Sequence, residues 1–202
     1  MADWEPIPHE TPLPDRSGLI QKHIKSRQDL HRAEARNVGR AVLKYLSARP
    51  SRRIAPFDLK WVYRLHKEMF GEVWMWAGIR RDTDLNIGVP WHRVETDLQQ
   101  MLDDLAYWRT HKVLPSFDQA VQVHFKAVAI HPFLNGNGRW ARMLANILLR
   151  QDAEPIVAWP SDEIGSTSPI RTEYIAAIQA ADRGDMQPLT DLHARYREPF
   201  LV

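Results

Sequence analysis

Apolar residues recur at helical spacing along most of the chain, and this pattern predicts a mainly helical protein. Between Ser26 and Ala48 they fall three and four positions apart, and Pro50 follows the end of that run. Asp58 has the residue type of an N-cap for a second helix, and Gly71 is placed to end it. Helical spacing returns from residue 98 to residue 106.

The next helix is expected to be the buried centre of the fold. Ser116 and Gln119 have the spacing of a capping box, and residues 120–130 after them are apolar nearly all round. After an interruption at residues 131–137, a further helix is expected to reach about Arg150. Ser168 and the proline after it predict the start of another helix that ends near residue 184, and a short last helix is expected over residues 188–196.

Two segments interrupt this helical pattern. Four prolines lie within the first 18 residues, so we expect residues 1–25 to form an extended arm and residues 26–202 to form the domain proper. The stretch from Trp74 to Pro90 is rich in glycine, aspartate and asparagine, which predicts turns and a small β-hairpin.

Composition narrows the classes of function. The chain has 202 residues and a formal net charge of only +2, with no block of lysine and arginine, so it does not have the charge of a nucleic-acid-binding protein. The absence of cysteine excludes disulfides, thiolate nucleophiles and sulfur-ligated zinc. No apolar run is long enough to span a bilayer, and the acidic N-terminus lacks the features of a signal peptide, which predicts a cytoplasmic protein.

The segment from His131 to Arg142, with the sequence HPFLNGNGRWAR, carries the candidate chemistry. We expect Gly136 and Gly138 to adopt positive φ and to turn successive N–H groups into an anion-binding nest at the start of a helix. Arg139 and Arg142 are three apart and share a helix face, an arrangement suited to polyphosphate.

A neutral imidazole at His131 can take a proton from a hydroxyl near pH 7. Each of these features alone is more often structural, but their combination favours a nucleotide site. His124 lies two turns before His131 and is expected to be a packed, hydrogen-bonded histidine rather than a metal ligand.

The same segment resembles the motif of the Fic family of nucleotidyltransferases, His-x-Phe-x-(Asp/Glu)-Gly-Asn-Gly-Arg-x-x-Arg, at every position but one. The similarity extends over residues 65–81 and 174–189, and the N-terminal half resembles a bacterial branch of the family called mobile mystery protein B. The resemblance implies the Fic (Fido) helical fold with a β-hairpin flap. It also implies an enzyme, a protein adenylyltransferase that moves AMP from ATP to a Tyr, Ser or Thr hydroxyl of a target protein.

The resemblance assigns a role to each matching position. His131 would be the general base, while Gly136, Asn137 and Gly138 would cradle the phosphates. Arg139 would neutralise their charge and Arg142 would reach the terminal phosphate. The flap that docks an extended stretch of the target would comprise Asp84, Leu85, Asn86, Ile87, Gly88 and Val89. Tyr174 is expected either near the adenine or in the core.

Two positions depart from the family pattern. Asn135 stands where the family has an acidic ligand for Mg²⁺, so we expect weakened rather than abolished metal binding. Many relatives are inhibited by a glutamate that pairs with the second arginine of the motif. Glu34 is the candidate here, but neither flanking residue fits that pattern, so an ordinary solvated position is favoured over a pair with Arg142.

Alternative functions stay open at this point. The loop could serve transfer of another phosphate-containing group, or the chain could be a nucleotide-binding regulatory module in which Asn135 weakens catalysis. The kinase branch of the family lacks this Gly-Asn-Gly and the second arginine, which argues against phosphorylation. The branch resemblance also implies an antitoxin-like partner protein.

Overall fold

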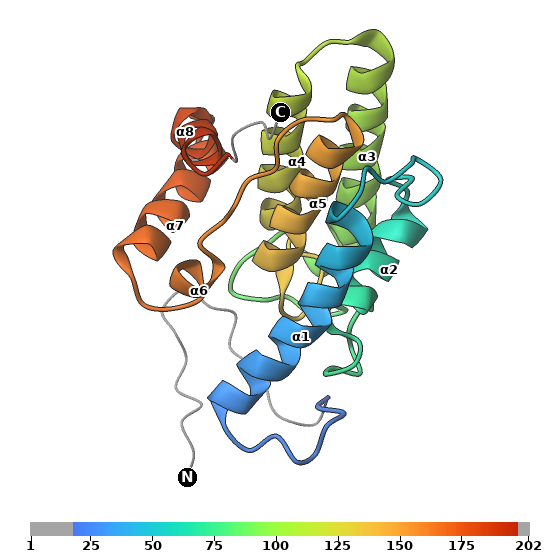
Figure 1. Ribbon diagram of the computed structural model, residues 1–202. Coiled ribbons are helices and arrows are strands. Elements are labelled where there is room, and N and C mark those ends of the chain that lie inside the picture. The colour runs from blue at the N-terminus through green and yellow to red at the C-terminus, as the bar shows by residue number, and fades with distance from the viewer. Residues whose placement is uncertain (1–17, 198–202) are drawn as a thin grey trace.

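The computed structural model describes residues 18–197, and residues 1–17 of the predicted arm lie outside this range. The helices of the described residues are shown in Figure 1; in chain order they are α1 (Arg27–Leu46), α2 (Leu59–Phe70), the 3₁₀ helix η1 (Trp91–Arg93), α3 (Val94–His111), α4 (Ser116–Ile130), α5 (Asn137–Gln151), α6 (Ser161–Ile164), α7 (Pro169–Asp182) and α8 (Gln187–Arg195). The expected mainly helical fold is confirmed. No described helix is both long and apolar enough to cross a membrane.

Most of the predicted helix starts are confirmed by their side-chain caps. Ser26, Asp58 and Ser168 each accept a hydrogen bond from the backbone N–H three residues further on. The capping box predicted at Ser116 is wrong. Ser116 is the first helical residue of α4, and its hydroxyl donates to the Asp152 carboxylate at 2.9 Å, a long-range partner that local spacing does not reveal.

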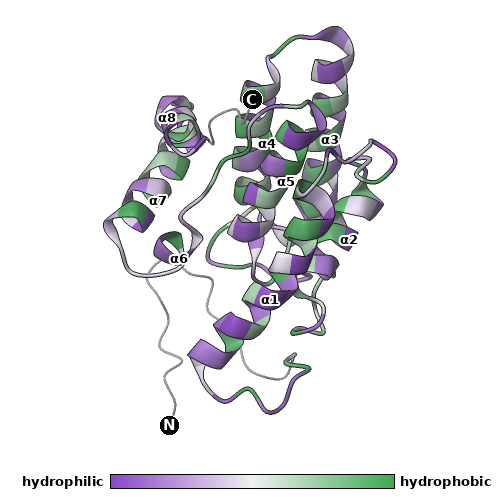
Figure 2. Ribbon diagram, in the orientation of Figure 1, coloured by the Kyte–Doolittle hydropathy of each residue, from purple (hydrophilic) through white to green (hydrophobic). Residues whose placement is uncertain are grey.

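The core lies around α4 and α5, which make the most extensive contact between helices in the described fold. α4 also packs against α3, α7 and α8, so its predicted central position is confirmed. α5 buries Trp140, Leu144 and Leu148 completely. A second apolar cluster joins α6, α7 and α8 to α4 through Val121, and Figure 2 shows hydrophobic and hydrophilic residues alternating around these helices.

The predicted β-hairpin between residues 74 and 90 is not formed. The β-pairings within residues 18–197 are two isolated bridges, Leu19 with Trp74 and Val157 with Arg197. The first bridge holds the described end of the N-terminal segment against the chain that follows α2, and Leu19 is buried there. The mainly helical part of the fold prediction therefore holds, whereas its small β element is replaced by turns.

Candidate active site

The loop between α4 and α5 begins at a residue in an uncommon backbone conformation. His131 ends α4 with φ 53° and ψ 61°, the left-handed region that a β-substituted residue rarely occupies. Its N–H still bonds the Ala127 carbonyl at 3.3 Å, and its own carbonyl accepts a 2.7 Å bond from Nε of the buried Arg81. These bonds fix the turn that directs the chain out of the core at His131.

The two glycines of the loop do different things. Gly136 caps α5 with φ 81°, as predicted, and a Cβ there would lie 2.8 Å from Phe70 Cε2, so no larger residue fits. The positive φ predicted for Gly138 is wrong, because Gly138 already belongs to the first turn of α5. What Gly138 provides is space beside that turn, where a Cβ would stand 3.6 Å from Nη1 of Arg142.

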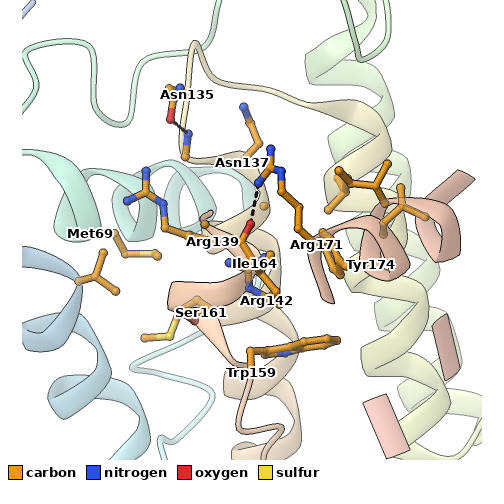
Figure 3. A pocket seen from close by; sticks show the side chains of 18 of the residues that line it. Met69, Asn135, Asn137, Arg139, Arg142, Trp159, Ser161, Ile164, Arg171 and Tyr174 are labelled. Carbon is orange, nitrogen blue, oxygen red and sulfur yellow. Dashed lines mark hydrogen bonds between the residues drawn. The ribbon is translucent and has the colours of Figure 1, made fainter. Parts of the chain in front are cut away.

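The two asparagine side chains stabilise the loop itself. The Asn137 amide bonds both polar groups of the Phe133 peptide, accepting from its N–H at 2.9 Å and donating to its carbonyl at 2.8 Å. Asn135 Oδ1 accepts the Gly136 N–H at 2.6 Å (Figure 3). Both polar atoms of the Asn137 side chain thus bond the Phe133 peptide, while its backbone N–H lies at the N-terminus of α5, where anions are favoured.

His66 of α2 is a member of this site whose position the sequence did not reveal. The ring is fully buried and stacked 3.6 Å from the ring of Phe133. Nδ1 accepts the Gly78 N–H at 2.9 Å, so the hydrogen must be on Nε2, which bonds the Asn135 carbonyl at 3.0 Å. Burial lowers the pKa of His66 to about 3. The neutral ring thus ties the loop to α2.

Arg139 faces α1. Its Nη1 donates to Glu34 Oε2 at 2.7 Å, and its guanidinium lies over the Phe70 ring, 4.7 Å from the centroid. The other carboxylate oxygen of Glu34 accepts the Trp74 indole N–H at 2.7 Å. Both expectations for Glu34 are therefore wrong, because it is only 4% exposed and its partner is Arg139 rather than Arg142.

Arg142 faces the opposite side, toward α7. It is buried, hydrogen-bonded to the hydroxyl of Tyr174, and its guanidinium carbon lies 5.4 Å from the centroid of that ring. Burial is the main cause that lowers the pKa of Arg142, yet the group stays cationic at neutral pH. Arg171 of α7, which sequence reasoning missed, lines the same side and donates to the Ile164 carbonyl at 2.6 Å (Figure 3).

His131 is held in the protonation state of a base. Burial, with a smaller contribution from the nearby Arg81 charge, lowers its pKa to about 4 against the opposing effect of a hydrogen bond to the Val128 backbone. A neutral imidazole carries one hydrogen, so one of its two ring nitrogens keeps a lone pair. At pH 7 the ring is neutral and able to accept a proton.

The predicted flap, residues 84–89, is a turn segment held from beneath by Arg81. This buried guanidinium donates to the carbonyls of Thr83 and Val89. These side-chain bonds hold the two ends of the segment together, and residues 84–89 take part in neither of the described β-bridges. Asp84 Oδ1 accepts the Trp91 N–H at 2.8 Å and ends the turn.

One cavity of about 1580 Å³ brings most of these residues together. Its walls come from α1, α5, α7, the α4–α5 loop and residues 156–166, and Figure 3 shows the arginines entering it from α5 and α7. The predicted site residues on its surface are Glu34, Ile87, Gly88, Val89, His131, Asn135, Gly136, Asn137, Gly138, Arg139 and Arg142. Asp84, Leu85 and Asn86 do not line it.

A metal site built from the protein alone is not evident. No group of three or more His, Asp or Glu side chains that could hold a metal occurs within residues 18–197. At the position expected for Mg²⁺ the chain offers one neutral amide oxygen, and that oxygen already accepts the Gly136 N–H. This donor set does not fit a cation that relies on one or two carboxylates.

Comparison with known proteins agrees with this geometry. The model of the Fic/DOC family matches residues 56–149. Protein adenylyltransferase fic-1 of Caenorhabditis briggsae is 28% identical over 141 residues, which cover 68% of this chain and 26% of that protein. Protein adenylyltransferase Fic of Drosophila grimshawi is 29% identical over 163 residues, covering 79% and 32%. The chain thus spans about a quarter to a third of the length of these relatives.

Solved structures share the fold. The crystal structure of BepC from Bartonella tribocorum with bound AMPPNP superposes with a TM-score of 0.65 at 23% identity, covering 89% of this chain and 91% of that one. Fic-1 from Caenorhabditis elegans, residues 134–508, gives a TM-score of 0.55 at 26% identity, with 69% and 40% covered.

Proposed function

We propose that this chain, whose residues 56–149 match the model of the Fic/DOC family, is a protein adenylyltransferase that transfers AMP from ATP to a hydroxyl of a target protein. One observation carries the proposal: a neutral His131 and the N-terminus of α5, flanked by Arg139 and Arg142, line the same cavity. A base beside a phosphate-binding helix end is the arrangement that attack of a hydroxyl on a bound nucleotide requires.

ATP would bind with its phosphates at the start of α5. The free N–H groups of Asn137 and Gly138 and the positive end of the helix favour negative charge there. Arg139 and Arg142 would add two guanidiniums, the latter toward the terminal phosphate. With no side chain at Gly138, a phosphate oxygen could lie where a Cβ would stand, 3.6 Å from Nη1 of Arg142.

The transfer itself is a single displacement. The target hydroxyl gives its proton to the unprotonated nitrogen of His131 while its oxygen bonds to the α-phosphorus. The bond from that phosphorus to the bridging oxygen of the β-phosphate breaks, and pyrophosphate leaves with the electron pair. The arginines neutralise the charge that develops on the leaving group. Negative charge from bound ATP also raises the pKa of His131 from its low unliganded value, which improves it as a base.

Mg²⁺ would reach this site mainly through the nucleotide. The phosphates of ATP supply anionic oxygens, and the Asn135 amide adds at most one neutral contact. Charge neutralisation is therefore assigned to the arginines, and the metal requirement of this chain should be weaker than that of a loop with an acidic residue at this position.

Residues 84–89 would position the target. Ile87, Gly88 and Val89 line the cavity beside His131, and a Cβ at Gly88 would stand 2.6 Å from His131 Cβ. An extended target segment could pair along this turn and bring a Tyr, Ser or Thr hydroxyl to the imidazole. The target and an antitoxin-like partner in a bacterial cytoplasm are further parts of the proposal that rest on the family resemblance.

Glu34 would restrain the enzyme. Its carboxylate accepts from Nη1 of Arg139 and compensates the charge of that guanidinium, so a phosphate would compete with Glu34 for Arg139. The restraint differs from the expected one in acting on the first arginine of the motif rather than the second.

A nucleotide-binding regulatory module is the second candidate, and the engaged amide of Asn135 favours it. Purified protein incubated with ATP labelled at the α- or the γ-phosphate separates the candidates. We expect α-label on protein, with the rate lowered about 10²- to 10⁴-fold by His131→Ala, because general-base catalysis contributes about that much. His111→Ala, at an exposed histidine of α3, is the control and should keep the wild-type rate.

Other outcomes of the same experiment contradict the proposal. Label transferred only from the γ-phosphate would mean phosphorylation, and nucleotide binding with no label on protein would favour the regulatory module. A rate in His131→Ala equal to that of the wild type would remove the base assignment.

A further inference from the structure

The partner of Arg142 is a neutral hydroxyl. The guanidinium and the Tyr174 hydroxyl meet beside the first turn of α5, since a Cβ at Gly138 would lie 3.6 Å from Nη1 of Arg142 and 3.9 Å from Oη of Tyr174. The salt bridges among residues 18–197 do not include Arg142, whereas Arg139 is paired with Glu34. A phenol oxygen orients the guanidinium without cancelling its charge.

Behind Tyr174 lies a chain of buried hydrogen bonds. The Tyr174 hydroxyl is 2.9 Å from His124 Nε2, and His124 Nδ1 is 2.7 Å from His193 Nε2. Both imidazoles are fully buried, and Trp159, which lines the cavity, packs edge-to-face against each of them. The chain runs from α5 through α7 and α4 to α8.

One direction in this chain of bonds follows from the chemistry of the groups. Arginine can only donate, so the Tyr174 oxygen accepts from Arg142. The same oxygen bonds His124 Nε2, and His124 Nδ1 bonds His193 Nε2, with directions set by the imidazole tautomers. In either direction, the two buried imidazoles hold the phenol oxygen in place.

Stability alone does not account for this arrangement. Apolar side chains of similar volume often stabilise a core at least as well as buried polar groups, and each polar group here must be desolvated. Three helices nevertheless contribute polar side chains to hold one oxygen on one guanidinium.

We propose that Tyr174, supported by His124 and His193, is a positioning residue that holds Arg142 with its charge available for the terminal phosphate of the nucleotide. This inference rests on the proposed function, because it needs a triphosphate in the cavity. It assigns Tyr174 to Arg142 rather than to the adenine, where the sequence alone left it.

Nucleotide titrations of Tyr174→Phe test the inference. Phenylalanine keeps the ring but loses the oxygen, so we expect affinity for ATP to fall about tenfold, a typical value for one hydrogen bond to a charged group. Affinity for AMP, which lacks the β- and γ-phosphates, should stay within twofold. In turnover assays, KM for ATP should rise while kcat changes little. Tyr196→Phe, at a half-buried tyrosine near Trp159, is the matched control.

A double-mutant cycle completes the test. In an Arg142→Gln background, Tyr174→Phe should cost no further ATP affinity, because the group through which it acts is gone. His124→Asn should lower ATP affinity with the same selectivity over AMP as Tyr174→Phe, and thermal unfolding would show that each variant is folded.

The outcomes that overturn the inference differ from those that overturn the proposed function. A wild-type protein that binds no nucleotide would remove both. A wild-type protein that binds ATP, with Tyr174→Phe weakening ATP and AMP equally, would leave the function and remove the positioning role. A tenfold loss that persists in the Arg142→Gln background would do the same.

Discussion

Arg139 and Arg142 belong to one helix face, but the two sides of the cavity treat them differently. On the α1 side, Arg139 shares its charge with the carboxylate of Glu34, and its side chain is 33% exposed. On the α7 side, Arg142 is buried against Tyr174, and its hydrogen bonds lead to two neutral imidazoles. The α1 side is electrically compensated and the α7 side keeps a positive charge.

This difference implies that Arg139 and Arg142 respond differently to an anion in the cavity. An anion that reaches Arg142 displaces no carboxylate, whereas one that reaches Arg139 must compete with Glu34. The α7 side should therefore bind phosphate without competition from a paired carboxylate, and the α1 side in competition with Glu34. Two arginines within one turn of α5 thus differ in their availability to phosphate: among the described residues Arg142 has no carboxylate partner, and Arg139 is paired with Glu34.

The largest expected effect is an acid sensitivity of the α7 side. Burial lowers the pKa of His193 to about 3, below its value of about 6.5 in an unfolded chain. Between these values the unfolded state binds the extra proton, so the free energy of unfolding is intact above pH 6.5 and falls as the pH drops below it.

Urea unfolding at successive pH values measures this effect. Below pH 6.5, each histidine that the fold keeps neutral lowers the free energy of unfolding by about 1.4 kcal/mol for every pH unit. His193→Gln should remove one such contribution from the slope, and His31→Gln, at an exposed histidine of α1, should not. Equal slopes for wild type and His193→Gln would show that His193 is not held neutral.

Replacing each arginine by glutamine should distinguish the two sides of the cavity, because the Arg142 variant should mainly lose ATP affinity and the Arg139 variant should also lose stability. Arg142→Gln should lower ATP affinity about 100-fold with little loss of stability, because it removes a buried charge that has no carboxylate partner. Arg139→Gln should lower ATP affinity only about tenfold and cost about 1–2 kcal/mol of unfolding free energy, because it leaves the buried Glu34 unpaired. Calorimetric titration and urea unfolding of both variants measure the contrast, and matching profiles would contradict it.

The smallest expected effect comes from removing the ion pair between Glu34 and Arg139. Glu34→Gln keeps an acceptor for the Trp74 indole and removes the negative charge that is paired with Arg139, so self-modification with α-labelled ATP should rise about three- to tenfold. Glu72→Gln, which removes an exposed ion pair with Arg40, is the control. A rate for Glu34→Gln no higher than that of the control would show that Glu34 imposes no restraint.

Much of the fold was predictable from local sequence. The caps at Ser26, Asp58 and Ser168 act on N–H groups three residues away, so their patterns are visible in short windows. The loop motif was visible for the same reason, because residues 131–142 are contiguous. Ser116 has an equally suggestive spacing, but its hydroxyl bonds Asp152 on another helix.

The site features that were missed depend on partners far along the chain. Glu34 meets Arg139 only because α1 lies beside α5, and residue type alone does not distinguish a buried glutamate from a solvated one. His66 reaches the loop across 69 positions, and its tautomer is set by the Gly78 N–H. Where the hairpin was predicted, the side chain of Arg81 bonds the carbonyls of Thr83 and Val89, a contact that local spacing does not reveal.

The contacts of Arg81 link the turn to the base. Its guanidinium holds the Val89 carbonyl of residues 84–89 and, through Nε, the carbonyl of His131 itself. A force that lifts the turn is thereby transmitted through one rigid planar group to the peptide that sets the imidazole's direction. In the proposed function, seating a target strand on the turn would therefore also orient the imidazole, and a badly seated target would meet a misaligned base.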